Sequence, residues 1–344
     1  MANKIDELSV TVIIPSRSYD FLLETCICET RKLYENVPII IILDENSNLP
    51  KFDFNNVKVI MSDRKNISSK RNLGVKNCDT EYIAFLDSDA YLCKNWLENA
   101  IGFLKENPDY SVVTGNYFGP ENESFMQTCI RLVQFSPLFI NPSLVKLIEQ
   151  DAKDSDEKIF AAANVIMRRN DYLKTGGMNE NIYINEDTEF SDRLYENGYK
   201  IRFKSDVSIY HRICMLYPFL RKIFCWGYYK LNMYVQERKC PKLGNYFTKN
   251  VKKYFLPHIL MLICIISVFF QKNSAVITVP LLFAAGVLII QSFLSAQKLK
   301  QRKISGFFII LYVSVLFCAV FLISSLLGFL NIKIKSIQQL YKQY

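Results

Sequence analysis

Two clusters of acidic residues stand where they could bind a metal ion or accept a proton. Asp87-Ser88-Asp89 comes directly after the apolar run Glu81–Leu86 (EYIAFL). Carboxylate oxygens in this position suit Mg²⁺ or Mn²⁺, and such an ion can bridge the phosphates of a substrate. Aspartate is also common in solvent-exposed turns after strands, so this triplet alone leaves both interpretations open.

The second cluster is Asn185-Glu186-Asp187-Thr188-Glu189, ahead of the amphipathic stretch Phe190–Asn197. Acidic residues are favourable where a helix begins, because they face the positive end of its dipole. A carboxylate in a ligand site can instead act as a general base. The spacing of these residues is equally compatible with the structural and the catalytic role.

A framework that could position the clusters is predicted by the first 90 residues. Four apolar runs rich in β-branched residues alternate with helical segments: 8–15, 37–43, 57–61 and 81–86. Apolar strands separated by helices are typical of an α/β fold with a parallel sheet that is covered on both faces. Ligands bind at the carboxyl ends of such strands, where Ser16, Asp44 and Asp87 occur. Neither a G-x-G-x-x-G nor a P-loop sequence is present, so those nucleotide-binding folds have no support.

Several segments, taken in order, resemble the family-2 inverting glycosyltransferases with the GT-A fold. They are Val10–Ser16 (VTVIIPS), Ile42–Ser47 (ILDENS), Ser68–Asp89 (SSKRNLGVKNCDTEYIAFLDSD) and Ala161–Arg202. Together they extend across about residues 8–212, and their order makes the match far more specific than any one motif. The resemblance implies a Rossmann-like GT-A catalytic domain with a mostly parallel sheet.

The resemblance also implies how the nucleotide of a sugar donor would be held. Pro15 and Ser16 would flank the base pocket through backbone contacts, and Asp44 would bond the nucleobase. Arg71 would contact the base or the diphosphate, and Asp87 would lie on the ribose side.

Metal binding and catalysis are assigned by the same resemblance. Asp89 would coordinate a divalent cation, Mn²⁺ or Mg²⁺, on the diphosphate, and Asp187 would be the general base. His211 matches a position near the metal in many relatives, although a structural role for a single histidine is equally open. Direct displacement with a base on one face and a departing nucleoside diphosphate on the other would invert the anomeric centre.

This chain departs from the family pattern in two places. Glu45 and Asn46 stand where the family often has Asp and Gly, and Asn tolerates the left-handed conformation that Gly would supply. No QxxRW-like sequence follows the acidic cluster, so a processive polymer synthase is not expected.

The C-terminal third is apolar enough to predict two to three transmembrane helices. The candidate segments are about 254–270, 275–294 and 306–330, and a helix needs roughly 20 apolar residues to cross a bilayer. Lysines and arginines cluster before the first segment and between the second and third. The positive-inside rule then predicts a multi-pass protein of the cell membrane with its catalytic domain in the cytoplasm.

The charge of the chain changes at about residue 200. Residues 201–344 carry 20 Lys and Arg against 2 Asp and Glu, and residues 212–249 mix eight of these cations with aromatic side chains. Such a segment next to apolar helices is typical of the lipid headgroup layer, and nucleic acid is not expected as a partner. The expected organisation is therefore a GT-A domain at 1–211, an interfacial segment at 212–253 and a membrane region at 254–344.

These features predict a membrane-attached glycosyltransferase that uses a nucleotide-sugar donor and a lipid-linked or glycan acceptor. Cell-surface polysaccharide or glycoconjugate synthesis is the expected setting. Two alternatives stay open. In a polyprenyl-phosphate glycosyl synthase the acceptor is already ionised, so Asp187 would matter less, and a non-catalytic sugar-nucleotide-binding membrane protein would not need Asp187 at all.

Overall fold

The computed structural model describes residues 9–47, 54–64, 66–139, 142–239, 246–250 and 274–330 of the 344-residue chain. It divides into two units, each of which is made of two separate stretches of the chain. Unit 1 comprises Met1–Glu123 and Asn141–Arg212, and unit 2 comprises Ser124–Ile140 and Ile213–Tyr344. The sequence predicts that the catalytic domain comprises residues 1–211, followed by regions at 212–253 and 254–344, and the inclusion of residues 124–140 in unit 2 was not expected.

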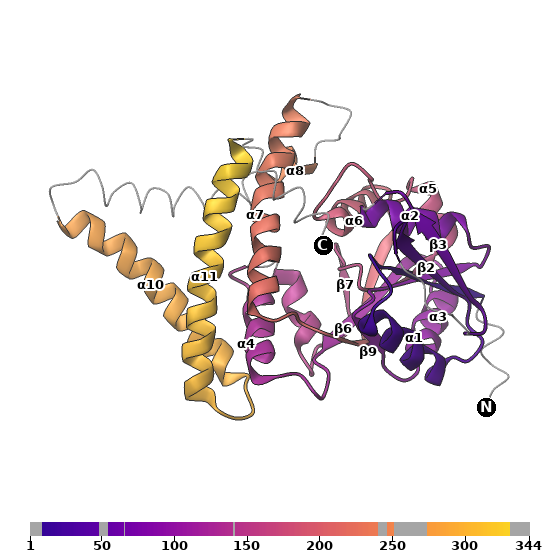
Figure 1. The fold of residues 1–344 in the computed structure, drawn as a ribbon, viewed down its shortest axis with the longest axis horizontal. Helices are drawn as coiled ribbons and strands as arrows, with labels where there is room; N and C mark the ends of the chain where they lie inside the picture. Colours follow the sequence, from indigo (N-terminus) through magenta and orange to yellow (C-terminus); the bar gives the residue numbers. More distant parts are fainter. Residues whose placement is uncertain are drawn as a thin grey trace. The chain divides into compact units, whose positions relative to one another are not determined.

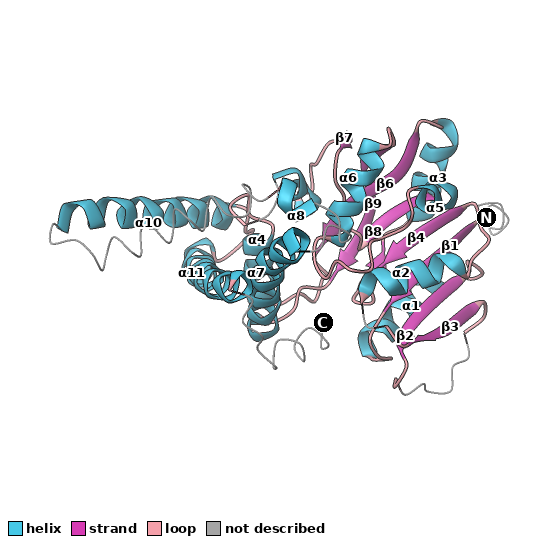
Figure 2. Cartoon of the chain, turned by 90° about the horizontal axis from the view of Figure 1, so that it is seen from above, coloured by secondary structure: helices cyan, strands magenta, loops and turns pink. Residues whose placement is uncertain are grey.

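Unit 1 is built on one mixed sheet, whose neighbouring strands follow the order β3-β2-β1-β4-β8-β6-β9-β5, with β7 paired to β9 (Figure 2). The strands are β1 (Val10–Pro15), β2 (Ile39–Asp44), β3 (Val57–Ser62), β4 (Tyr82–Leu86), β5 (Ala90–Leu92), β6 (Tyr110–Phe118), β7 (Ser155–Glu157), β8 (Asn164–Arg168) and β9 (Lys200–His211).

The first four strands of this order run parallel, so their carboxyl ends meet at one edge. β1 pairs with β2 on one side and with β4 on the other, and β2 pairs with β3. β8 is antiparallel to both β4 and β6, while β6 and β9 are parallel. The expected α/β fold with parallel strands at its centre is confirmed, with the antiparallel strands β5, β7 and β8 added to it.

Helices cover the sheet because its strands are apolar on both faces. The helices of unit 1 are α1 (Phe21–Leu33), α2 (Ile67–Lys76), α3 (Trp96–Glu106), α5 (Arg169–Lys174) and α6 (Glu186–Glu196), with a 3₁₀ segment at Pro142–Ile148. Buried Ile13, Ile42 and Phe85 pack against Val75 of α2 and Phe190 of α6 in one hydrophobic cluster. This packing fixes the first turns of α2 and α6 next to the strand ends.

Gly74 allows α2 to approach the sheet closely. A Cβ at this position would overlap the side chain of Ile13 and press on that of Ile42. At the other end of the helix, Asn66 accepts hydrogen bonds from the N–H groups of Ser68 and Ser69 as an N-cap. The helix between these points carries Lys70 and Arg71, and its fixed position determines where these cations lie.

Unit 2 consists of helices in the residues that the structure describes. They are α4 (Phe125–Gln134), α7 (Leu216–Lys239), α8 (Tyr246–Lys249), α10 (Ser274–Gln297) and α11 (Lys303–Phe329). α7 and α11 lie side by side (Figures 1 and 2). Two glycines allow the approach, because a Cβ on Gly328 would overlap the backbone carbonyl of Tyr228 and one on Gly227 would overlap Ser324.

Two of the three predicted membrane segments lie in described helices. The segment at 254–270 lies outside the described residues, while 275–294 is part of α10 and 306–330 is part of α11. Among the described residues, α11 is the one helix that is long and apolar enough to cross a membrane. The described part of α10 contributes a shorter apolar helix, Ala284–Gln297.

The basic and aromatic segment at 212–253 is described at residues 212–239 and 246–250. Most of it forms α7, and within this helix the aromatic side chains of Phe219, Tyr228 and Tyr229 are buried. Glu237, the single acidic residue of the segment, is also buried and accepts hydrogen bonds from the N–H groups of Phe247 and Thr248. α7 therefore packs within unit 2, and contact of α7 with lipid stays a prediction.

Candidate functional site

Three predicted site residues lie at the carboxyl ends of neighbouring parallel strands. Pro15 is the last residue of β1, Asp44 is the last residue of β2, and Asp87 directly follows β4. Ser16 extends β1 by one backbone bond, because its N–H donates to the carbonyl of Ile42 at 2.8 Å. The edge that ordinarily carries ligands in open α/β sheets is thus lined by the residues that the sequence indicated.

Asp87, Asp89 and His211 form one group of possible metal ligands. One ligand atom from each lies within 4.8 Å of the others, and Nε2 of His211 is 3.3 Å from Oδ1 of Asp89. The cause is strand pairing, since Ala90 of β5 stands opposite His211 in the antiparallel pair with β9. Two carboxylates and an imidazole fit a divalent cation such as Mn²⁺, which accepts both oxygen and nitrogen ligands.

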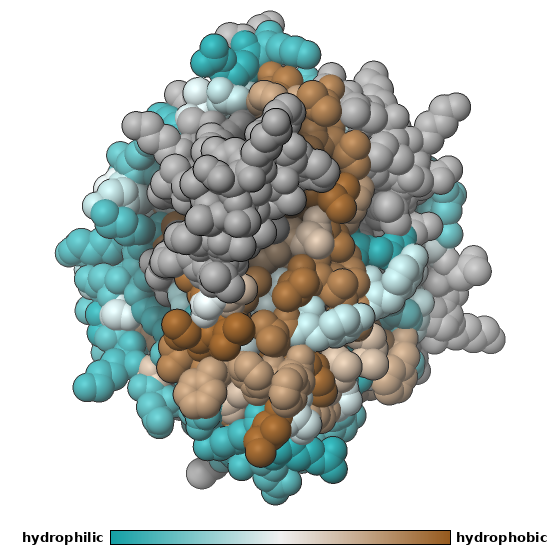
Figure 3. Space-filling view, turned by 90° about the vertical axis from the view of Figure 1, so that its left-hand side faces the viewer, coloured by the Kyte–Doolittle hydropathy of each residue, from teal (hydrophilic) through white to brown (hydrophobic). Residues whose placement is uncertain are grey.

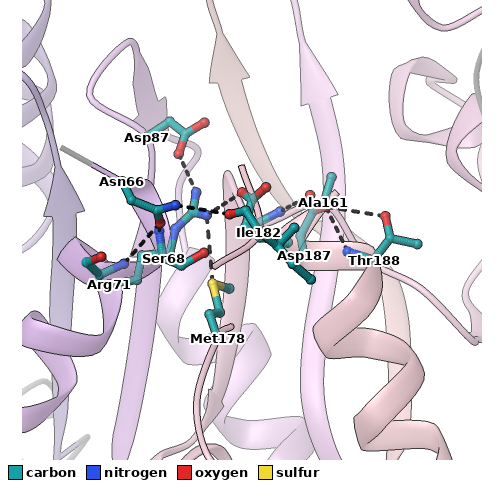
Figure 4. A network of polar contacts seen from close by, with 12 residues as sticks. Asn66, Ser68, Arg71, Asp87, Ala161, Met178, Ile182, Asp187 and Thr188 are labelled. Carbon is teal, nitrogen blue, oxygen red and sulfur yellow. Dashed lines mark hydrogen bonds and ion pairs between the residues drawn. The ribbon is translucent and has the colours of Figure 1, made fainter. Parts of the chain in front are cut away.

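Arg71 connects this group to the second acidic cluster. Its side chain is 3% exposed, and Nη2 lies 3.0 Å from Oδ1 of Asp87 (Figure 4). Nη1 lies 3.0 Å from Oε1 of Glu186. Burial alone would lower the pKa of Arg71, but the carboxylates of Asp87, Glu186 and Asp187 outweigh it and raise the pKa. The guanidinium therefore stays charged and holds two acidic segments together that are about one hundred residues apart in the chain.

The second cluster forms the first turn of α6, four residues earlier than the helix expected at 190–197. Asn185 precedes it in the left-handed conformation, with φ of 60°, and Glu186 begins the helix. Asp187 is held by the backbone, because Oδ2 accepts from the N–H of Ala162 at 3.3 Å and Oδ1 from that of Thr188 at 2.7 Å. The cluster thus both begins a helix and places a carboxylate in the site.

Burial makes the acidic pair on α6 more basic than free carboxylates. It raises the pKa of Asp187, an effect that Arg71 and the two backbone N–H groups only partly offset. The pKa of Glu186 is raised by burial and by the neighbouring Asp187 carboxylate. A carboxylate with a raised pKa is a more effective proton acceptor near neutral pH.

Lys70 is a site residue that the sequence analysis did not identify. Its Nζ lies 2.5 Å from Oδ1 of Asp44 and 2.5 Å from the carbonyl oxygen of Ser16, and its side chain is 3% exposed. It therefore ties the ends of β1 and β2 together. One feature of the sequence could have identified Lys70 as a site residue. It stands next to Arg71 in the first turns of a helix that faces acidic strand ends.

Tyr117 and Glu186 were also not assigned from the sequence. The ring of Tyr117 packs against His211 with centroids 5.6 Å apart, and its hydroxyl donates to the carbonyl of Ala161 at 2.5 Å. Ala161 precedes Ala162, whose N–H binds Asp187. Tyr117 belongs to β6, a strand with no polar motif at its end, so neither spacing nor composition distinguished it from a core tyrosine.

Comparisons with known proteins bear on the family and the fold. Residues 11–176 match the model of glycosyl transferase family 2. The pre-mycofactocin glycosyltransferase of Mycobacterium tuberculosis is 25% identical over 209 residues, which are 59% of this chain and 42% of that protein. An uncharacterized glycosyltransferase of Rickettsia bellii is 33% identical over 108 residues, which are 29% of this chain and 16% of that protein. This chain therefore spans less than half the length of these relatives.

One solved structure extends the likeness over nearly the whole chain. The mannosyltransferase of Pyrobaculum calidifontis, solved in complex with GDP-Man and Mn²⁺, superposes with a TM-score of 0.56 at 12% identity and covers 94% of this chain and 88% of that one. At this identity the likeness shows the fold alone. The family model and the fold are consistent with each other, and residues 11–176 carry a glycosyl transferase family 2 domain.

Proposed function

We propose that this chain is a metal-dependent, inverting glycosyltransferase that moves a sugar from a nucleotide-sugar to a lipid-linked glycan or a similar acceptor. The observation that carries the proposal is the linkage made by Arg71. One buried guanidinium bonds Asp87, which is one of the possible metal ligands, and Glu186, which stands beside the possible base. A transferase needs these two functions on either side of one reacting carbon, and this chain keeps them within one polar network.

The donor would lie along the carboxyl ends of β1, β2 and β4. Pro15 and Ser16 would flank the nucleobase, Asp44 would accept a hydrogen bond from it, and Asp87 would face the ribose. Arg71 would exchange part of its bonding to Asp87 and Glu186 for the diphosphate, since one guanidinium offers five N–H donors.

Asp87, Asp89 and His211 would hold the divalent cation, Mn²⁺ or Mg²⁺. Support comes from the ligand atoms that lie within 4.8 Å of one another and from the Mn²⁺ complex of the Pyrobaculum relative. When bound, such a cation neutralises the charge that develops on a departing diphosphate.

Asp187 would take the proton from the acceptor hydroxyl. The N–H groups of Ala162 and Thr188 fix its carboxylate, and the raised pKa makes it a suitable acceptor. The site needs no nucleophile of its own, because the acceptor attacks the sugar directly. A single displacement of this kind inverts the configuration at the anomeric carbon.

Membrane attachment is supported by the two sides of α11. Beyond its first turn, its exposed residues are predominantly apolar, and the large exposed apolar residues of the helix are Ile304, Phe308, Tyr312, Val315, Ile323, Leu326 and Phe329. The buried side combines larger apolar residues with small ones, among them Ser314, Ser324, Ser325 and Gly328. Small residues between helices and large apolar residues outside are typical of helices in lipid.

The face drawn in the space-filling view carries a broad apolar area (Figure 3). A membrane-embedded helix in the enzyme would bring it to a lipid-linked acceptor, in the synthesis of cell-surface polysaccharide or glycoconjugate. The multi-pass arrangement with a cytoplasmic catalytic domain rests on the basic residues that flank the apolar segments.

The proposal is tested with the full-length protein in detergent and a panel of sugar nucleotides, with and without Mn²⁺. Release of one nucleoside diphosphate that requires Mn²⁺ and increases with lipid-linked acceptor is the expected result. Equal rates with simple polyprenyl phosphates would favour the phosphate-acceptor alternative. Binding of a sugar nucleotide without turnover by any acceptor would favour the non-catalytic alternative.

A further inference from the structure

A buried ion pair between Lys70 and Asp44 lies at the position proposed for the nucleobase. The ammonium of Lys70 is 2.5 Å from Oδ1 of Asp44, and it also donates to the carbonyl of Ser16. The two side chains are 3% and 13% exposed. A buried ammonium with two oxygen partners stays in place because leaving either partner without its proton donor would be costly.

The helix that carries Lys70 is itself fixed. Asn66 caps the start of α2, and Gly74 lets the same helix pack directly on β1 and β2. Lys70 thus reaches the strand ends from a rigid element, and its ammonium determines how the Asp44 carboxylate is oriented.

This pair leaves Asp44 with one oxygen for a ligand. Oδ1 is fully buried beside the Lys70 ammonium, so the exposed part of the carboxylate is on the side of Oδ2. A carboxylate that is paired with an ammonium acts toward a ligand as an acceptor of hydrogen bonds. The base pocket therefore offers a single, fixed acceptor from this residue.

Nucleobases differ in what they present to such an acceptor. Uracil and thymine have one ring N–H between two carbonyls. Guanine has a ring N–H next to an amino group, and these two adjacent donors need two acceptors. Cytosine and adenine have a ring nitrogen that accepts, so it would face the carboxylate unfavourably.

We propose that the Lys70–Asp44 pair selects a donor nucleotide whose base is uracil or thymine. The inference rests on the proposed function, because it takes Asp44 as the residue that bonds the base. Lys70 is a positioning residue in this scheme: it acts through Asp44, by burying one carboxylate oxygen and turning the other toward the ligand.

The first test is calorimetric titration of the full-length protein with UDP, dTDP, GDP, CDP and ADP in the presence of Mn²⁺. UDP or dTDP should bind about 5- to 150-fold more tightly than GDP, the range expected when one donor of guanine is left without an acceptor. GDP binding as tightly as UDP would overturn the inference and leave the proposed function intact. Failure of every nucleotide to bind would contradict the proposed function itself.

Asp44→Asn tests the orientation that Lys70 imposes. The ammonium of Lys70 should bond the amide oxygen and turn the amide NH₂ toward the ligand, so that the residue becomes a donor. CDP, with its accepting ring nitrogen, should then gain affinity relative to UDP by at least about tenfold. An unchanged order of UDP and CDP would contradict a contact between residue 44 and the base.

Lys70 is tested in the double variant Asp44→Asn/Lys70→Met, because Lys70→Met alone would leave a buried carboxylate without its partner. Without the ammonium the amide can present either edge, so the CDP preference of Asp44→Asn should fall to within about threefold of no preference. The control is Lys76→Met in the Asp44→Asn background. Lys76 is an exposed lysine on the same helix, so this variant should keep the CDP preference. A double variant that retains the full preference would show that Lys70 does not orient residue 44.

Discussion

Asp187 combines two properties at the scale of a single side chain. Two backbone N–H groups hold its carboxylate in place, and burial raises its pKa above that of an ordinary aspartate. The backbone hydrogen bonds favour the ionised form of Asp187, whereas burial disfavours it. The effect of burial on the pKa is the larger of the two. Such a carboxylate is preorganised and more basic, which is what the removal of a hydroxyl proton requires.

Asp187→Asn should keep donor binding and lose transfer. The amide has nearly the same size as the carboxylate, so the turn around α6 should stay folded while the proton acceptor is gone. We expect transfer to fall about 10²- to 10⁴-fold, measured as turnover with donor and acceptor. Glu196→Gln, an exposed acid-to-amide change in the last turn of the same helix, is the control. Transfer within a few-fold of wild type would instead support an acceptor that is already ionised.

The raised pKa of Asp187 predicts the direction of a pH effect. A base must be deprotonated, so activity should fall as the pH drops through a value above the ordinary aspartate pKa of about 3.9. Glu186 titrates beside it, and the acid limb of the profile belongs to the pair. The measurement is the pH profile of the transfer rate. An acid limb that persists unchanged in the residual activity of Asp187→Asn would assign the titration to another group.

At the residue scale, the sequence identified the groups that end a strand or begin a helix in a recognisable motif. Asp87, Asp89 and Asp187 were found this way, and the structure brings the first two together with His211. Lys70 and Tyr117 were missed because their importance depends on which elements become neighbours. Nothing near Tyr117 in the sequence indicates that its ring packs on a histidine 94 positions later.

At the scale of secondary-structure elements, α7 and α11 pack against each other through small residues. Gly328 lies against the backbone of Tyr228, and Gly227 lies against Ser324 and Ser325. Close approach lets dispersion contacts act along the length of both helices, which is the main attraction available to helices in lipid.

Gly328→Val should destabilise the helical unit, because its side chain would overlap the backbone of Tyr228, which cannot move aside alone. We expect a loss of about 1–3 kcal/mol, as for other overpacked positions. Gly286→Val on α10 is the matched control, since a Cβ at Gly286 meets no atom within 4 Å. Thermal unfolding in detergent measures both, and equal melting temperatures for the two variants would argue against this helix pair.

Elements were predictable where their pattern is local. The four apolar strands β1 to β4 were expected within two residues of their observed ends. β6 and β9 were not recognised, and their pairing contains register shifts near Gly115 that break a simple alternation. The grouping of α4 with the helical unit was also missed, because its amphipathic sequence gives the apolar face but not the element that covers it.

The whole molecule joins a sheet-based domain to a chain segment with the composition of a membrane protein. The exposed apolar residues of α11 would be unfavourable in water, and the 27 residues of this helix exceed the roughly 20 that a bilayer requires. The basic residues of α7 could add attraction to anionic lipid, but this attraction is screened by salt.

The full-length protein should therefore stay with the membrane fraction after washing with 1 M salt and be released by detergent. Salt weakens the electrostatic contribution and leaves apolar burial in place. Sedimentation followed by immunoblotting measures the distribution. Release of most of the protein by salt alone would mean that basic residues, and not α11, attach it to the membrane.

The most direct test of the proposed site is the Mn²⁺ dependence of nucleotide-sugar binding and turnover in Asp89→Ala. Asp89 belongs to the one group of possible metal ligands found among the described residues, so its loss should abolish the Mn²⁺-dependent part of both. Asp79→Ala, which removes a fully exposed carboxylate paired only loosely with Arg169, should change neither. We predict Mn²⁺-dependent binding and turnover in the wild type and in Asp79→Ala, and neither in Asp89→Ala. Unchanged affinity and unchanged Mn²⁺ dependence in Asp89→Ala would contradict the metal-dependent transferase site.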